Sequence, residues 1–312
     1  MKCRVTLIAA FATLAATAFF STRTQAEPNQ VKYIAPGVWF REGDMEQGHC
    51  NNVIIEMKDY LLVVDANYPS GARLTMADCK RISSKPVKYI FDTHHHGDHL
   101  YGNSVWTETG ATTLAYIGVA EELKRYEPAR WQSSAKSRKD VGELNRPAPE
   151  PPKETFDKSP YILKDSSREV RFYHFGWAHT RGDAMVYLPK EHILCTGDAV
   201  VNGPYNNTAD ANIGNWPNVI RAAGQKLNVE QVLPGHGVPG VKELLEAQAQ
   251  YLTELYKGVQ SGIAAGKSAE DITPTLKFAE SAKKWAGTGL ATQVKHAYEE
   301  ISQKKPHGDL PH

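Results

Sequence analysis

The sequence predicts an α/β fold that ends in a run of helices. Segments rich in β-branched and aromatic residues alternate with segments of helical apolar spacing from residue 31 to about residue 240. After Gly240 the pattern is helical as far as about residue 303, with breaks near Gly266, Pro274 and Gly287. With 312 residues, 41% hydrophobic and 23% charged, the chain is long enough to bury a sizeable core.

The first 26 residues have the layout of a cleavable signal peptide. Lys2 and Arg4 precede an apolar run over residues 5–20, and a polar stretch then ends in the small residue Ala26. The apolar run is shorter than the roughly 20 residues of a membrane-spanning helix. We therefore expect residues 1–26 to be removed, no stable membrane anchor to remain, and the mature protein to be periplasmic or secreted.

Charge and cysteine content narrow the class of partner. Lys and Arg number 36 and Asp and Glu number 35, so the composition does not favour a nucleic-acid partner, and we expect a small-molecule substrate. Export would place Cys50, Cys79 and Cys195 in an oxidising compartment. A disulfide between Cys50 and Cys79 is one of the pairings open to three cysteines, and the spacing does not decide it.

The segment from residue 31 to residue 126 predicts strands first and then alternating helices and strands. Turn residues separate its β-branched and aromatic runs, which favours antiparallel pairing. The predicted strands lie at 38–40, 52–57, 61–64, 87–91 and 112–117. Apolar residues at helical spacing predict a helix at 70–83, and a second helix follows the last of these strands and ends near Tyr126.

Residues 128–160 differ from the rest of the chain. They are polar and carry four prolines between positions 147 and 152, which predicts a long irregular connection. Such a connection is either a flap over a functional site or a solvated surface loop. Beyond it the sequence predicts strands at 161–163, 170–175, 184–187 and 193–196, a helix at 216–227 and a strand at 232–233.

The strongest chemical signal is a cluster of metal-binding side chains directly after the strand at 87–91. His94 and His96 are two residues apart in extended backbone, so they project to the same side. Asp98 and His99 follow at once, where the chain should turn into a helix. Four such side chains within six residues predict a metal site rather than separate core or surface histidines.

Three further candidate ligands, His179, Asp198 and His236, each lie in a loop after a strand and near glycine. Glycine lets the backbone turn sharply and approach a crowded site closely. Loops at strand ends are also where rigid scaffolds present functional groups. We therefore expect these three side chains to join the first cluster.

The four loops resemble the motifs of the metallo-β-lactamase superfamily. A His-x-His-x-Asp-His loop at 94–99 is followed by Ala-His-Thr at 178–180, Gly-Asp at 197–198 and Pro-Gly-His at 234–236. The resemblance implies a four-layer αβ/βα sandwich with the metals at one edge between two β-sheets. It also implies a metal hydrolase domain over residues 27–240, with the helices of 241–312 packed on the same domain.

The same resemblance implies which residues bind metal. One metal would be held by His94, His96 and His179, a second by Asp98, His99 and His236, and Asp198 would bridge the two. Imidazole and carboxylate ligands without thiolate suit Zn²⁺, two ions per chain, with Fe²⁺ or Mn²⁺ as alternatives.

Two such ions lower the pKa of a shared water, which makes a bridging hydroxide available for attack on a carbonyl carbon. Asp98 is the candidate catalytic residue, because it could also orient the nucleophile. Asp65 and Asp183 are candidate outer partners that would fix imidazole tautomers. A role as strand-end turn carboxylates explains both equally well.

The resemblance leaves the substrate open. Export favours a cyclic amide of the β-lactam kind or a small ester. Many secreted lactamases of the superfamily have Cys at the position of Asp198 and Lys three residues on, where this chain has Val201. A bridging aspartate together with His99 looks more like glyoxalase II or a lactonase, so a thioester or lactone substrate is an alternative. Two further alternatives are an iron-dependent oxidoreductase of the same fold and a non-catalytic zinc-binding protein.

Substrate contacts are the least constrained prediction. Tyr101 and Trp106 follow the first histidine loop and Asn207 follows Asp198, so these side chains could line a cleft. Packing at helix starts and turn chemistry explain the same residues equally well. Among the other histidines, His49 is the one that could line the site.

Overall fold

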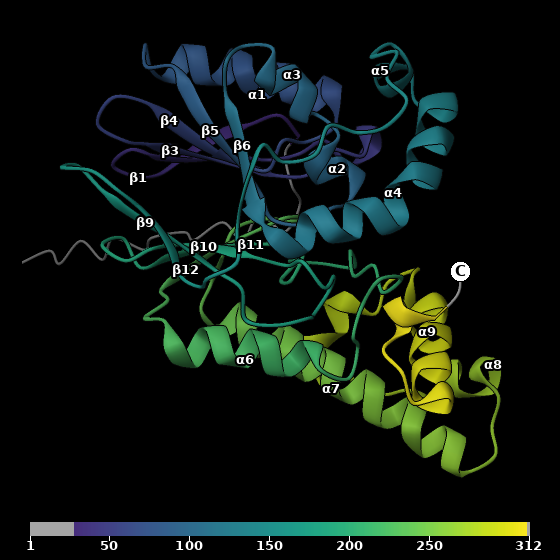
Figure 1. Cartoon of the computed structure of the whole chain (residues 1–312). Helices are drawn as coiled ribbons and strands as arrows, with labels where there is room; N and C mark the ends of the chain where they lie inside the picture. The colour runs from purple at the N-terminus through teal and green to yellow at the C-terminus, as the bar shows by residue number, and fades with distance from the viewer. Residues whose placement is uncertain (1–27, 311–312) are drawn as a thin grey trace, which may run out of the picture.

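The computed structural model describes residues 28–310, so the expected signal peptide at residues 1–26 lies outside the described residues. Two β-sheets pack face to face, and helices cover the outer face of each sheet (Figure 1). This is the four-layer αβ/βα sandwich that the resemblance in sequence implies. No helix within residues 28–310 is both long and apolar enough to cross a membrane.

The first sheet joins an antiparallel half to a parallel half. Within residues 28–310 its strands pair in chain order from β1 to β7. The first four strands are antiparallel, and β5, β6 and β7 add to them in parallel. Their bounds are β1 (Val31–Ala35), β2 (Val38–Arg41), β3 (Asn52–Glu56), β4 (Leu61–Val64), β5 (Val87–Asp92), β6 (Thr112–Tyr116) and β7 (Glu154–Phe156).

Helices α1 (Pro69–Ile82) and α3 (Asn103–Thr107) cover the outer face of this sheet (Figure 1). Proline suits the first position of α1, because an N–H at that position has no partner within a helix. Cys79 of α1 and Trp106 of α3 are buried in one apolar cluster with sheet residues such as Ile90. The expected helix at 70–83 is therefore confirmed, and its apolar face is the one that packs on the strands.

The expectation of an irregular connection over residues 128–160 is wrong in its first part and again at β7 (Glu154–Phe156). Helix α4 (Ile117–Ser137) continues through Pro128, and α5 (Lys139–Gly142) follows it, which leaves residues 143–153 irregular. A proline inside a helix costs about 3 kcal/mol. The helix continues because Leu123 and Trp131, on either side of Pro128, are buried in one cluster with the first sheet.

The second sheet follows the order β13-β12-β11-β10-β9-β8 within the described residues. Strands β11 and β12 are parallel, and the other neighbours are antiparallel. The bounds are β8 (Tyr161–Lys164), β9 (Glu169–Tyr173), β10 (Met185–Leu188), β11 (Ile193–Gly197), β12 (Gln231–Pro234) and β13 (Gly240–Val241).

An apolar core fills the space between the two sheets. Phe91 of β5 and Phe172 of β9 meet at a ring-centroid distance of 4.5 Å. Both are buried in one cluster with residues from both sheets, including Cys195. Cys50, Cys79 and Cys195 are all buried and free, so the structure does not contain the disulfide that the sequence left open.

Helices after β11 cover the second sheet and complete the fold. Trp216 of α6 and Trp285 are buried in one cluster with apolar residues of α7 and α9. The helical bounds are α6 (Trp216–Lys226), α7 (Glu243–Ala264), α8 (Ala269–Ile272) and α9 (Leu290–Gln303), with 3₁₀ turns η1 (Met45–Gln47), η2 (Thr273–Thr275), η3 (Glu280–Trp285) and η4 (His307–Asp309). The breaks fall near Gly266, Pro274 and Gly287, where the sequence predicts them.

Candidate metal centre

Four loops place the predicted ligands together, and each loop follows a strand. β5 ends at Asp92, and α2 (Gly97–Leu100) begins four residues after Thr93, with Asp98 and His99 in its single turn. The other ligands follow three strands of the second sheet: His179 after β9, Asp198 after β11 and His236 after β12. Residues far apart in the sequence therefore meet at one edge of the sandwich.

Three imidazoles form the first group. His179 Nε2 lies 3.0 Å from His96 Nδ1. The ring centroid of His94 lies 4.7 Å from that of His96 and 4.8 Å from that of His179. One ring nitrogen of each residue lies within 4.8 Å of the others, which is close enough for all three to hold one ion.

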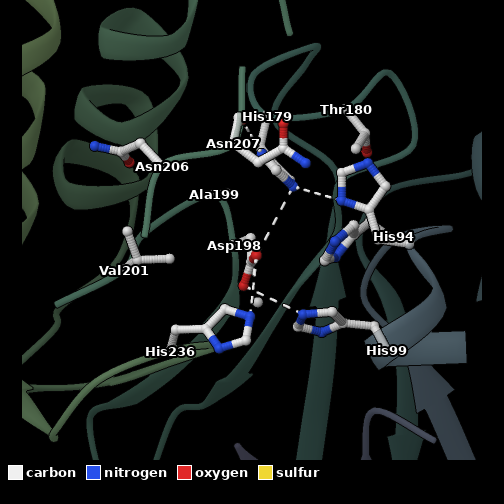
Figure 2. Close-up of polar contacts among 12 residues, drawn as sticks. His94, His99, His179, Thr180, Asp198, Ala199, Val201, Asn206, Asn207 and His236 are labelled. Carbon is white, nitrogen blue, oxygen red and sulfur yellow. Dashed lines mark hydrogen bonds and ion pairs between the residues drawn. The ribbon is translucent and has the colours of Figure 1, made fainter. Parts of the chain in front are cut away.

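A second group forms around Asp98, His99 and His236. Asp98 Oδ2 lies 3.0 Å from His236 Nε2 and 3.4 Å from His99 Nε2. Asp198 stands between the two groups: Oδ1 lies 3.3 Å from His99 Nε2, and Oδ2 lies 3.4 Å from His236 Nε2 and 3.8 Å from His179 Nε2. Figure 2 shows its carboxylate facing all three imidazoles.

The donor set fits metal ions. His94 Nε2, His99 Nε2 and Asp198 Oδ1 are buried and have no hydrogen-bond partner within residues 28–310. Burying polar atoms without partners is costly, so such atoms at one point indicate a ligand. Imidazole nitrogens and carboxylate oxygens are ligands of first-row divalent cations, and all seven predicted side chains converge on the same place.

The two groups differ in electrostatics. Burial lowers the pKa of His179 to about 3 and holds the pKa of His94 well below its usual value. For His236 burial opposes the effect of the carboxylates, but Asp198 and Asp98 raise its pKa to about 9. His94 and His179 are therefore held as neutral imidazole, the form that binds a metal. His96 differs, because burial lowers its pKa but Asp210, through its hydrogen bond and its charge, outweighs burial and raises it.

The two expected outer partners behave differently. Asp65 Oδ2 lies 2.9 Å from His99 Nδ1, and its Oδ1 accepts hydrogen bonds from the backbone and hydroxyl of Thr93. Asp183 meets no predicted ligand through its carboxylate, and its one imidazole contact is from its backbone carbonyl to His174 Nδ1 at 2.8 Å, so the role as a strand-end turn carboxylate fits it. Its carboxylate accepts from the backbone N–H and the hydroxyl of Thr180, so it closes the turn after His179 instead.

Sequence reasoning missed Asp210 and the carbonyl of Asn207. Asp210 Oδ2 lies 2.8 Å from His96 Nε2, and the Asn207 carbonyl lies 2.9 Å from His179 Nδ1. Both residues belong to an Asn- and Asp-rich stretch between β11 and α6 that carries no recognisable metal motif. The run of turn-forming polar residues is the signal that marks this stretch, but it does not identify Asp210.

Of the three predicted substrate contacts, two line a pocket and one does not. A pocket of about 390 Å³ opens beside His96 and Asp98, and Tyr101 and Asn207 line it. Trp106 does not, because it is fully buried and donates its indole N–H to the Ala66 carbonyl. Its role is to pack α3 on the first sheet.

His49 does not contact any of the predicted ligands. Its Nε2 lies 2.8 Å from Ser70 Oγ, and Ser70 in turn donates to Asp140. His49 is also absent from the lining of the pocket beside Asp98. Its place in the structure is in the contact between the β2–β3 loop and α1.

Gly235 is required by the close approach of two ligand loops. A Cβ at this position would lie 2.1 Å from Asp198 Oδ1, so an alanine would displace the carboxylate. We expect Gly235→Ala to weaken metal binding by at least about 10-fold, measured as the metal retained by purified protein against a chelator. Gly224→Ala in α6 is the control. A Cβ at this position would lie 3.4 Å from Leu245 Cδ1, which is ordinary van der Waals contact, so metal retention should not change. Equal retention in both variants would contradict the assigned position of Asp198.

Comparison with known proteins agrees with this geometry. Residues 45–253 match the sequence model of the metallo-β-lactamase superfamily. The chain is 26% identical over 207 residues to the metallo-β-lactamase type 2 of Bacillus cereus, a match covering 62% of this chain and 70% of that one. A metallo-β-lactamase type 2 of Bacillus sp. (strain 170) is 26% identical over 204 residues, covering 62% and 69%.

Solved structures of similar fold come from the same group of proteins. The metallo-β-lactamase from Pontibacter korlensis has a TM-score of 0.57 at 23% identity, covering 72% of this chain and 98% of that one. The metallo-β-lactamase from Hirschia baltica has a TM-score of 0.58 at 22% identity, covering 73% and 98%. At these identities the likeness establishes the fold.

Proposed function

The chain belongs to the metallo-β-lactamase superfamily, and we propose that it is a zinc-dependent hydrolase that opens a cyclic amide or a small ester bond. The observation that carries the proposal is the convergence of seven ligand side chains, Asp198 among them, at one place, with three buried ligand atoms that have no hydrogen-bond partner in the described residues. A metallohydrolase of this superfamily is the class that this donor set supports.

Two cations would divide the ligands between them. His94, His96 and His179 would hold one, Asp98, His99 and His236 would hold the other, and Asp198 lies near both groups. When bound, such a pair makes hydroxide available near neutral pH and polarises the carbonyl under attack. A set without thiolate suits Zn²⁺.

Asp98 is the ligand best placed for proton transfer. Its side chain is 24% exposed, whereas those of His94, His99 and His179 are fully buried. It lines the pocket beside the ligands, so it faces the space where a substrate would lie. From there it can accept the proton of the attacking water and return it to the leaving nitrogen or oxygen.

One observation favours a lactone or another ester as a second candidate. Val201, at the position where many secreted lactamases carry a substrate-binding lysine, is fully buried, and its carbonyl accepts the indole N–H of Trp285. Its side chain packs in the apolar cluster formed with residues of α6, α7 and α9. Among the described residues that line the pocket, Arg130 is the one arginine or lysine, and Asp210 already pairs with it. A substrate without a carboxylate suits this pocket.

The direct test is hydrolysis of a chromogenic cephalosporin by the purified, zinc-loaded protein. We expect turnover that a chelator abolishes and added Zn²⁺ restores, and no turnover above background with His96→Ala. If the protein hydrolyses an uncharged lactone or ester but not the cephalosporin, the cyclic amide is overturned as the substrate class and the ester is retained. No metal-dependent hydrolysis of any of these substrates would contradict the proposed function.

A further inference from the structure

A short segment between β11 and α6 supplies a partner to two of the three histidines in the first group. The carbonyl of Asn207 lies 2.9 Å from His179 Nδ1, and Asp210 Oδ2 lies 2.8 Å from His96 Nε2. A carbonyl oxygen and a carboxylate oxygen can only accept, so each of these ring nitrogens must carry the proton.

In the neutral form of each ring, which is the form that binds a metal, that assignment leaves the lone pairs on His179 Nε2 and His96 Nδ1. These two atoms face each other at 3.0 Å. Two lone pairs at this distance repel each other unless a metal ion or a proton lies between them. Residues 207–210 therefore turn both rings toward the same point, with the coordinating nitrogens directed inward.

Asp210 is itself held rigidly. It is fully buried, and Arg130 of α4 donates to both of its oxygens, with Nη1 2.6 Å from Oδ2 and Nη2 2.7 Å from Oδ1. This paired geometry fixes the plane of the carboxylate. His95 Nε2, 3.1 Å from Oδ2, is a further neighbour. The carboxylate therefore cannot rotate away from His96 without breaking several contacts.

The C-terminal helices clamp the same segment. Thr208 Oγ1 lies 2.7 Å from His296 Nδ1 on α9, and the Ala209 carbonyl lies 2.7 Å from His307 Nδ1 on η4. The backbone N–H of Gly308 donates to the Ala211 carbonyl at 3.0 Å. Just beyond the segment, Glu300 of α9 accepts backbone hydrogen bonds at residues 213 and 214.

We propose that residues 207–210, clamped by α9 and η4, are a positioning element for the three-histidine metal site, with Asp210 as the positioning residue for His96. The proposal rests on the metal binding in the proposed function, and it makes the C-terminal helices part of what sets the affinity of that site. Asp65 is the matched carboxylate of the other group, since its Oδ2 faces His99 Nδ1 at 2.9 Å and its Oδ1 accepts hydrogen bonds from Thr93.

The test compares the two carboxylates in proteins that retain one site. His236→Ala leaves the three-histidine site, and His179→Ala leaves the other. Zn²⁺ affinity is measured by competition with a chromophoric chelator. In the His236→Ala background we expect Asp210→Asn to weaken Zn²⁺ binding by about 10- to 100-fold and Asp65→Asn to leave it unchanged. In the His179→Ala background we expect the reverse.

Each outcome has a distinct meaning. If Asp210→Asn and Asp65→Asn weaken both sites equally, or Asp210→Asn weakens neither, the positioning role is wrong. If the His236→Ala parent takes up no Zn²⁺ at all, the proposed function fails instead. Thermal unfolding of the metal-free variants checks their folding, because a positioning residue should lower metal affinity more than metal-free stability.

Thr208→Val tests the contacts that α9 and η4 make with residues 207–210. It also tests the proposal if the Asp210→Asn protein does not fold. It removes the hydroxyl that contacts His296, and we expect Zn²⁺ affinity of the three-histidine site to fall in the same direction as for Asp210→Asn, by a smaller factor. Thr253→Val on α7 is the control, because its hydroxyl donates to the Ala249 carbonyl of its own helix and accepts from Arg221 of α6, away from residues 207–210. A Thr208→Val protein that binds Zn²⁺ as tightly as Thr253→Val would overturn the contribution of the C-terminal helices.

Discussion

Asp198→Ala is expected to cause the largest loss of activity of any single substitution. Its carboxylate lies between the two ligand groups, within 3.3 Å of His99 Nε2 and 3.8 Å of His179 Nε2. Its removal takes a ligand from both sites at once. Losing one stabilising group typically lowers the rate by about 10²- to 10³-fold. We therefore expect kcat/KM for hydrolysis to fall by more than that. The measurement is kcat/KM with zinc in excess, together with the zinc content of the purified variant.

Asp165→Ala is the matched control for this prediction. Asp165 is also an aspartate in a loop, but its Oδ1 accepts from Ser167 and the backbone of Arg168 in a surface turn. We expect its zinc content and kcat/KM to match the parent protein. An Asp198→Ala protein that keeps two zinc ions and more than a tenth of the parent activity would show that this carboxylate is not shared by the two sites.

Trp285→Ala is expected to cause the largest loss of stability. The side chain is fully buried in the cluster that joins the C-terminal helices to α6, and its indole donates to the Val201 carbonyl at 2.8 Å. Truncation leaves a cavity and a buried carbonyl without its partner. We expect the free energy of unfolding to fall by about 3–5 kcal/mol, with a further contribution from the lost hydrogen bond, measured by denaturant unfolding.

Tyr33→Ala is the control for that loss, because the residue is also aromatic but 63% exposed. Surface substitutions usually change stability by about 0.5 kcal/mol or less. If Trp285→Ala changed the free energy of unfolding no more than Tyr33→Ala, the C-terminal helices would not be packed as part of this fold.

The parts of the molecule that depend on local pattern could be predicted from the sequence. The spacing of His94, His96, Asp98 and His99 needs one strand end and one helical turn, and the structure has both, in β5 and α2. The helix at 70–83 and the breaks near Gly266 and Pro274 also follow from apolar spacing and from glycine or proline. Each of these features is decided by residues close together in the sequence.

The parts that depend on distant contacts could not be predicted. Asp210 is one of several polar turn residues, and its position is set by Arg130 and by the C-terminal helices. Asp183 looks equivalent to Asp65 in sequence, yet its carboxylate turns back to Thr180. Pro128 indicates a helix end, but burial of its neighbours keeps α4 continuous. Burial and pairing in three dimensions decide these cases.

We propose that seven side chains, with Asp198 between the two groups, hold two zinc ions. The most direct test is a crystal structure of zinc-loaded protein with anomalous diffraction at the zinc edge. We expect two anomalous peaks per chain, each about 2.0–2.2 Å from its ligand atoms, one within the three-histidine group and one beside Asp98, His99 and His236. Anomalous density away from these residues, or none in either group, would contradict the claim.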